Sequence, residues 1–387
     1  MLAVAAYLAA AIWVGILLWP ARPWNTRQRI EAGRPDADPG ELTVLIPARN
    51  EAQTIVACLR SVLAQGPTLR IVVVDDRSED RTAEMVSALG SERITLISGQ
   101  PLPTGWTGKL WALQQGLAHA STEQILLLDA DILLAPGILS VLKAKLLDDG
   151  LGLVSIMARL RTETFWERLL VPAYIYFFKL LYPFAQVNTP THRMAAAAGG
   201  CILLRKDALE QAGGFDVLKD ALIDDCTLAA RIKQAGWPIH LALSHAVTSI
   251  RGYAKLNDLW RLVARTAYTQ LNYSVMYLLG CTFAMLVMFV APVLAVLSGN
   301  PPVVVVGMVA WLVMALTQLP VMHFYGLSPV RALLLPLVAV LFLGMTWDSA
   351  RRYWTGAGAR WKGRAYDYPD RSLAAAPGAG LDDTGRD

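Results

Sequence analysis

Charged residues are scarce in this sequence. They make up 17% of its 387 residues, against roughly 25% in average soluble domains, while hydrophobic residues make up 55%. Residues 1–21 contain no charged side chain, and residues 266–347 contain only Arg331. The shortage excludes both an ordinary soluble protein and a disordered one. Because the stretch in between has normal charge density, the sequence predicts a globular domain anchored in a membrane.

A basic excess and paired cysteines are missing as well. The net charge is 35 − 31 = +4, which is too small and too scattered to indicate nucleic-acid binding. The four cysteines lie far apart and form no CxxC pair, so we expect neither a disulfide framework nor a zinc site. They are predicted to be reduced thiols in a protein that faces the cytosol: Cys58, Cys201, Cys226 and Cys281.

Apolar runs at both ends predict membrane segments. Leu2–Trp19 is apolar throughout and is followed at once by Arg22, which indicates an uncleaved anchor with its basic flank in the cytoplasm. Three further runs approach the ~20 residues needed to span hydrocarbon. They are Val275–Ser298, Pro302–Met322 and Ala332–Trp347.

Strand and helix signals alternate between these segments, which predicts an α/β fold with a mostly parallel sheet covered on both faces. Such sheets bind ligands at the carboxyl ends of their strands. The predicted strands are Leu42–Ile46, Ile71–Val74, Ile94–Ile97 and Ile125–Leu128, and the predicted helices between them are Asn50–Leu63, Thr82–Leu89 and Lys109–His119. Polar residues follow three of the strands: Arg49 to Glu51, Asp75 with Asp76, and Asp129 with Asp131.

The acids at these strand ends indicate a cation site. Asp129 and Asp131 can both reach one Mg²⁺ or Mn²⁺ shared with substrate phosphates. Alone, such a pair also fits a solvated turn. Asp75 and Asp76 favour the site, because four acids at one edge need a cation or a ligand rich in donors. Lys109 follows a Gly-rich loop and opens a predicted helix, where it would hold a diphosphate or lie on the surface.

Several segments occur together in a known order. Over residues 42–270 they resemble the motifs of family 2 glycosyltransferases, which have the GT-A fold: Leu45–Glu51, Val73–Thr82, Gly108–Lys109, Leu127–Asp131 and Ile223–Arg231. Nearly the whole chain resembles a narrower group, the hopene-associated glycosyltransferases of hopanoid biosynthesis. The segments that carry this likeness are Pro103–Trp111, Phe165–Leu170, Ala195–Cys201 and Ala221–Cys226.

The resemblance implies a nucleotide-diphosphate sugar, a UDP-sugar by preference, as donor of a hexosyl or N-acetylhexosaminyl group. It implies that Asp76 faces the base and that Arg49 and Glu51 lie near the base and ribose. It also implies that Asp129 and Asp131 hold the metal on the diphosphate. The remaining donor-binding residues would be Pro47, Asp75 and Lys109.

The catalytic and acceptor residues follow from the same resemblance. Asp225 would be the base of an inverting displacement, with Asp224 beside it, and the helix that starts there would keep both acids ionised. A helix cap is the alternative role for either acid. Gly199 and Gly200 would let the backbone approach the sugar or the acceptor.

The sequence departs from the family in two places. The usual Glu-Asp pair is Asp224-Asp225, and the QxxRW signature of processive synthases is missing, with Arg265 near its place. The second departure favours transfer of one sugar over polymer synthesis.

A lipid acceptor is indicated by two segments. Trp166–Phe184 and Tyr253–Tyr273 combine aromatic, apolar and basic residues, so we expect helices in the membrane interface near the catalytic mouth, with ordinary core helices as the alternative. Trp361–Tyr366 resembles a WKGR-type segment of related lipid glycosyltransferases. There, Lys362 and Arg364 would close over phosphates, or would form part of a solvated basic tail.

The expected enzyme is therefore a multi-pass protein of the cell (inner) membrane that glycosylates a lipid, with its catalytic domain on the cytoplasmic face and a lipid-synthesis complex as a further partner. Transfer to polyprenyl phosphate and a silent scaffold role remain alternatives. If the domain and the basic tail share one side, an even number of crossings separates them, so Ala332–Trp347 is expected not to span. The predicted parts are an anchor at 1–21, a linker at 22–41, a GT-A domain at 42–272, a hydrophobic region at 273–349 and a tail at 350–387 with a disordered end.

Overall fold

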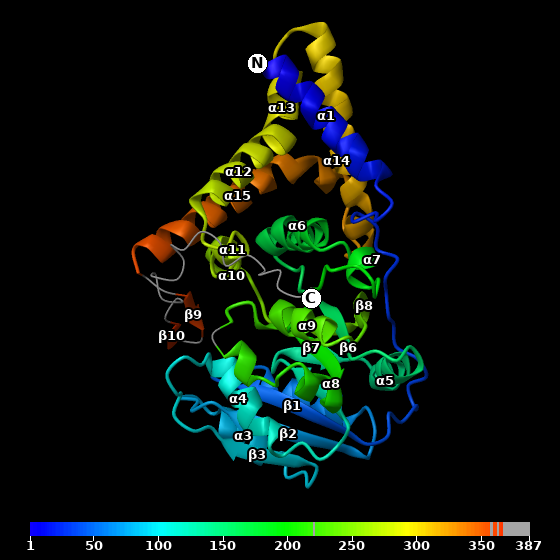
Figure 1. Cartoon of the computed structure of the whole chain (residues 1–387), viewed down its shortest axis with the longest axis vertical. Coiled ribbons are helices and arrows are strands. Elements are labelled where there is room, and N and C mark those ends of the chain that lie inside the picture. The colour runs from blue at the N-terminus through cyan, green and yellow to red at the C-terminus, as the bar shows by residue number, and fades with distance from the viewer. Residues whose placement is uncertain (220, 357–358, 362–363, 367–387) are drawn as a thin grey trace, which may run out of the picture.

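The computed structural model has an α/β domain below a tower of apolar helices (Figure 1). It describes residues 1–219, 221–356, 359–361 and 364–366, the last two segments by their backbone alone. The strands of the main sheet are β1 (Leu42–Ala48), β2 (Leu69–Asp75), β3 (Ile94–Ser98), β4 (Gln124–Leu128), β5 (Ile132–Leu134), β6 (Leu153–Arg159), β7 (Cys201–Arg205) and β8 (Ile239–Ser249).

The sheet has eight strands in the order β3-β2-β1-β4-β7-β6-β8-β5. The first four are parallel neighbours, β7 runs antiparallel to β4 and β6, β8 is parallel to β6, and β5 is antiparallel to β8. Every residue of β1 and β4 is buried, as expected for central strands covered on both faces. The predicted mostly parallel α/β sheet is confirmed in this mixed form.

The carboxyl ends of β1, β2 and β4 meet at one edge. Ala48 pairs with Asp75 across β1 and β2, and Leu45 pairs with Leu127 across β1 and β4. The polar residues that follow these three strands therefore share an edge, as the sequence predicts.

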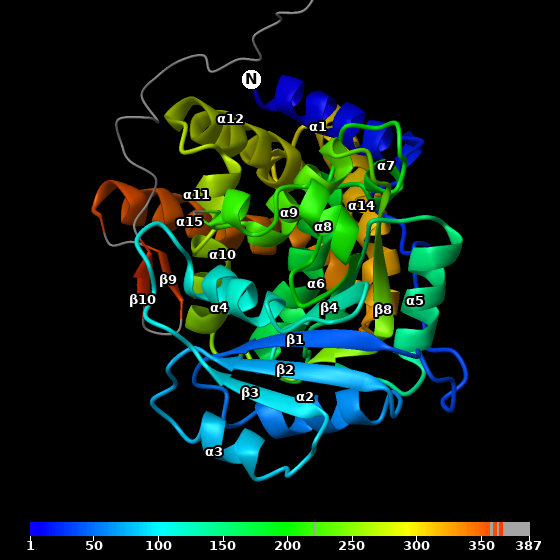
Figure 2. The ribbon, with the colours of Figure 1, turned by 60° about the horizontal axis from the view of Figure 1, so that its bottom comes forward.

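Helices cover both faces of the sheet (Figure 2). The predicted helix from Asn50 begins only at Ile55, because Asn50 has a positive φ of 51° that a helix cannot contain. The helices of the domain are α2 (Ile55–Leu63), α3 (Thr82–Ser87), α4 (Gly108–Leu117), α5 (Ile138–Asp148), α6 (Phe165–Leu181), α7 (Phe184–Val187), α8 (Lys206–Gln211) and α9 (Asp224–Gln234).

Helix α6 lies between the sheet domain and the apolar helices (Figures 1 and 2). It is continuous through Pro172, and most of its middle is buried. Only its ends carry strongly exposed apolar side chains, with Phe165 62% and Leu181 60% exposed. The predicted interfacial helix is thus largely a core helix that joins the two parts of the protein.

The second predicted interfacial segment, Tyr253–Tyr273, is not one helix. It forms α10 (Leu256–Ala264) and α11 (Ala267–Gln270), and the chain then turns through positive φ values of 49° and 54° at Asn272 and Tyr273. α10 is strongly amphipathic, and it packs against α6 and α15.

The apolar helices match the predicted runs. Among the described residues, three helical stretches are long and apolar enough to cross a membrane: Val275–Val296, Pro301–Phe324 and Pro329–Trp354. The first comprises α12 (Val275–Met285), a π-helical turn and α13 (Ala291–Val296), the second is α14 (Pro301–Phe324), and the third ends in α15 (Leu335–Trp354). The N-terminal α1 (Leu2–Leu18) is shorter and packs against α13 and α14.

Part of the predicted linker forms backbone hydrogen bonds with strand β8. Ile30 N–H donates to Leu243 O at 3.0 Å, and Leu243 N–H donates to Gln28 O at 2.9 Å. His245 bonds both Glu31 at 2.8 Å and the Phe324 carbonyl at 2.9 Å. The linker, β8 and the end of α14 are therefore tied together.

Candidate active site

Lys109 stands at the centre of the acid cluster. It opens α4, and its Nζ lies 2.8 Å from Asp129 Oδ1 and 4.0 Å from Asp224 Oδ2. It also donates to the Gly199 carbonyl at 3.2 Å. Burial disfavours its charge, but the two carboxylates outweigh burial and raise the pKa of Lys109. The lysine predicted for the diphosphate therefore also contacts the predicted catalytic acids.

Asp225 is held by the backbone at the start of α9. Its Oδ2 accepts the Gly199 N–H at 2.7 Å, and its Oδ1 accepts the Cys226 N–H at 2.8 Å. Burial, and then the negative charge of Asp224, raise the pKa of Asp225 to about 6. Burial and Asp224 thus bring the pKa of Asp225 closer to neutrality, yet the acid is still mostly ionised at pH 7, as a general base requires.

Gly199 lies where a side chain would have very little room. A Cβ there would lie 3.1 Å from Asp225 Oδ2 and 3.2 Å from Lys109 Nζ. The neighbouring Gly200 faces Ile132, and a Cβ at Gly200 would lie 3.2 Å from the isoleucine Cδ1. Gly199 thus brings its backbone against the two key charges, whereas Gly200 packs against an apolar side chain.

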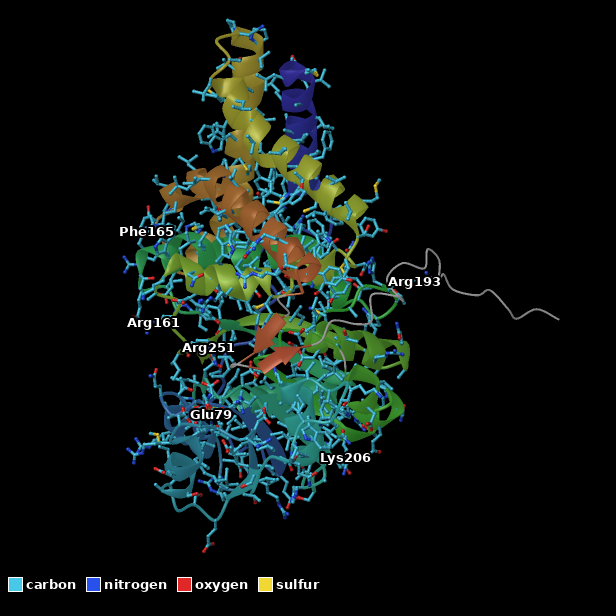
Figure 3. All side chains as sticks on the ribbon, turned by 90° about the vertical axis from the view of Figure 1, so that its left-hand side faces the viewer. Glu79, Arg161, Phe165, Arg193, Lys206 and Arg251 are labelled. Carbon is cyan, nitrogen blue, oxygen red and sulfur yellow. The ribbon has the colours of Figure 1, made fainter. Side chains whose placement is uncertain are left out.

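Arg251 binds Asp131, and the sequence-based prediction missed it. Its Nε donates to Asp131 Oδ2 at 2.7 Å, and its Nη2 donates to Glu51 Oε1 at 2.6 Å. Figure 3 shows Arg251 between Arg161 above and Glu79 below, where the sheet domain meets the helices. One feature of the sequence could have identified Arg251: it follows a strand, β8, as the other polar residues of the predicted site do.

Arg49, one of the predicted donor-binding residues, lines a separate hollow of about 440 Å³. Arg49 donates to the carbonyls of Asp76 at 2.7 Å and Arg77 at 2.8 Å, so it shapes the wall of this hollow. Its lining consists of Arg49, Arg77, Ser78 and Glu79.

The acids at the end of β2 are buried. Asp76 is fully buried, and Asp75 is 9% exposed. Asp75 Oδ2 accepts the Ser78 N–H at 3.2 Å, while its buried Oδ1 receives no hydrogen bond from the described part of the chain. Pro47 lies in β1 beside Val74 of β2.

Only some of the predicted acceptor residues lie near Asp225. Arg265, at the end of α10, is exposed and forms no ion pair among the described side chains. Burial raises the pKa of Tyr174 in α6, the charge of Arg265 opposes this rise, and Asp225 adds to it.

The tail residues can be described only by their backbone. Trp361 ends β9 (Ala359–Trp361) and Arg364 begins β10 (Arg364–Tyr366), which pair antiparallel. This hairpin lies beside α4 in Figures 1 and 2. Lys362 and the predicted disordered end lie outside the described residues.

Asp129 and Asp131 suit a divalent cation by their chemistry, since they offer hard carboxylate oxygens at an open sheet edge, where Asp129 is 36% exposed. Within the described ranges, no group of three or more His, Cys, Asp or Glu side chains could hold a metal by itself. A metal that takes two carboxylates and completes its shell with substrate phosphates fits this donor set.

The acids and the lysine lie at the carboxyl edge of an α/β sheet, which is where such sheets bind their ligands. Residues 43–213 match the family model for Glycosyl transferase family 2. This stretch of the chain is therefore similar to the catalytic domain of family 2 glycosyltransferases.

A 146-residue stretch is 30% identical to the 4,4'-diaponeurosporenoate glycosyltransferase of Staphylococcus aureus strain bovine RF122 / ET3-1, and proteins of the same name in other strains of this species match similarly. The match covers 37% of this chain and only 38% of that relative.

Among solved structures, the mannosyltransferase PcManGT of Pyrobaculum calidifontis, in complex with GDP-Man and Mn²⁺, aligns with a TM-score of 0.53 and 22% identity. The alignment covers 91% of this chain and 98% of that one, and it shows a shared fold. The predicted GT-A fold is confirmed.

Proposed function

We propose that this protein is a membrane-bound glycosyltransferase that moves one sugar from a nucleotide-diphosphate donor to a lipid acceptor. The observation that carries the proposal is the Lys109 contact with both Asp129 and Asp224. One ammonium there serves the donor end and the acceptor end of the same cluster.

The donor diphosphate would lie along the sheet edge at Lys109. Asp129 and Asp131 would hold a Mg²⁺ or Mn²⁺ that supplies positive charge for the leaving diphosphate. The nucleoside would occupy the hollow lined by Arg49, Arg77, Ser78 and Glu79. A UDP-sugar is our first choice, and the GDP-Man in PcManGT makes a GDP-sugar the second to test.

Asp225 would act as the general base of an inverting displacement. The acceptor oxygen bonds to the anomeric carbon while the bond from that carbon to the diphosphate breaks. The hydroxyl proton passes to the Asp225 carboxylate, and the nucleotide leaves with the electron pair. A pKa of about 6 leaves this acid mostly ionised at pH 7 and strong enough as a base.

The acceptor would arrive from the helical side of Asp225. Tyr174 and Tyr182 of α6 lie there, and Tyr182 donates to Gln270 Oε1 of α11 at 2.7 Å. α6 packs against α14 and α15, so this side leads directly to the apolar helices. The motifs shared with hopene-associated glycosyltransferases favour a hopanoid-type lipid, and the S. aureus relative, itself a lipid-modifying enzyme by name, supports the lipid class.

The membrane topology is part of the proposal. α1, α13 and α14 form the tower, whereas α15 runs across its base (Figure 1). α15 packs along α10 and α11, and its Asp348 accepts the Trp260 Nε1–H of α10 at 2.9 Å. Asp348 also pairs with Arg351 and Arg352. Such a charged end belongs in the interface, so α15 would lie in the plane and the tail would return to the catalytic side.

A second acceptor class is favoured by Arg265. This exposed guanidinium has no ion pair among the described residues. It could bind the phosphate of a polyprenyl phosphate, whose oxygen is already anionic and needs no base. The silent-scaffold alternative is disfavoured because buried charges in such a cluster are costly to retain.

The test uses full-length protein in detergent with radiolabelled UDP-glucose, UDP-N-acetylglucosamine or GDP-mannose. Each donor is offered with a hopanoid alcohol, with polyprenyl phosphate or without lipid. We expect transfer to the alcohol by wild type and a large loss with Asp225→Asn. Transfer to polyprenyl phosphate that survives Asp225→Asn would select the second acceptor. Absence of both donor binding and transfer would overturn the proposal.

A further inference from the structure

Arg251 forms a two-armed bridge between acids that come from distant parts of the chain. Its Nε lies 2.7 Å from Asp131 Oδ2, and its Nη2 lies 2.6 Å from Glu51 Oε1. Both acid side chains are only 9% exposed. Removing such carboxylates from water is costly unless a cation compensates them, and Arg251 is the cation that does so.

The loop that carries Arg251 is fixed on both sides. On one side, Ile250 N–H donates to the Asp131 carbonyl at 2.9 Å, and the Ser249 hydroxyl donates to Asp131 Oδ2 at 3.1 Å. On the other side, Tyr253 N–H donates to Glu167 Oε1 at 2.7 Å.

Glu167 is itself a rigid support. It is fully buried, and its other oxygen accepts the N–H groups of Glu163 at 2.8 Å and Thr164 at 2.9 Å at the start of α6. Burial opposes the charge of Glu167, but these backbone bonds outweigh burial and lower its pKa. The backbone of the Arg251 loop is therefore fixed beside Asp131, and only the arginine side chain can turn away.

We propose that Arg251 is an internal counterion that competes with a divalent cation for Asp131. Two positive charges cannot share one carboxylate without strong repulsion at this distance. The cation would bind Asp131 well only when Arg251 turns away, toward Glu51 or toward the phosphates of an arriving donor. The protein without nucleotide would consequently bind the metal weakly. The nucleotide and the metal would each increase the affinity of the protein for the other.

This inference concerns the metal side of the proposed function, but its test needs no sugar transfer. Binding of Mn²⁺ alone to the full-length protein in detergent is measured from the EPR signal of free Mn²⁺, without nucleotide. Arg251→Gln is expected to bind Mn²⁺ about tenfold or more tightly than wild type. Arg81→Gln makes the same charge change at an exposed ion pair with Glu84, so it should leave Mn²⁺ binding unchanged.

Arg251→Lys provides a second test should Arg251→Gln fail to fold. Its ammonium keeps the charge but lacks the two-armed fork, so we expect an affinity between wild type and Arg251→Gln. Adding Asp131→Asn to the variant that folds should abolish the gain. Equal Mn²⁺ affinity in wild type and both Arg251 variants, or no binding in any of them, would overturn the proposal, whether or not the protein transfers sugar.

Discussion

Lys109 Nζ lies 2.8 Å from Asp129 Oδ1, and this pair joins a helix start to a strand end across the sheet edge. Because the same ammonium also lies 4.0 Å from Asp224, the acids predicted to bind the donor and the acids predicted to be catalytic form one charge network. A substitution of Asp129 should therefore change the electrostatic environment of Asp224, and a substitution of Asp224 should change that of Asp129.

Asp225→Asn should lower kcat by roughly 10²–10⁴-fold, the usual effect of losing a general base. The amide can still accept the Gly199 N–H, so donor affinity should stay near that of wild type. Initial rates and donor binding, measured on the same preparation, check this. Asp224→Asn is the matched control and should lose less. A reversal of the two would assign the base role to Asp224.

The pH profile should report Asp225. The base must be ionised, and its pKa is raised to about 6, so kcat/KM should fall as the pH drops through about 6. Asp224→Asn removes a negative charge that raises this pKa, so the acid limb should move to lower pH. A limb that stays in place in Asp224→Asn would show that the titrating group is not Asp225.

Activity should depend on a divalent cation. Asp131→Asn should abolish turnover and weaken metal-dependent nucleotide binding, while the fold survives because Asp131 lies at the sheet edge. Activity assays with excess EDTA, followed by Mg²⁺ or Mn²⁺ addition, and thermal unfolding of the variant test both parts. Full activity in EDTA would contradict the metal site at Asp129 and Asp131.

Single cysteines should report the topology in a Cys281→Ser background, where the remaining cysteines are buried. Ser298→Cys lies between α13 and α14 and should react with an impermeant maleimide from the periplasmic side of intact cells. Thr355→Cys, which follows α15, should react only after lysis. Labelling of both from outside would show that α15 spans the membrane.

Local patterns in the sequence determined much of the architecture. Strand and helix positions follow from burial and spacing over a few residues, and the apolar runs at both ends are visible by composition alone. The convergence of Asp75 and Asp129 at one edge also follows, because parallel strands present their carboxyl ends together. The helix start at Ile55 did not follow from spacing, since it depends on a single turn at Asn50.

Tertiary structure alone decided the remaining relationships. Arg251 is 120 residues from Asp131 and 200 from Glu51, so no local pattern links them. The direction of α15, the burial of α6 and the bond of the linker to β8 likewise depend on which surfaces meet after folding. Periodicity specifies that a helix has an apolar face, but only packing decides whether lipid or protein covers that face.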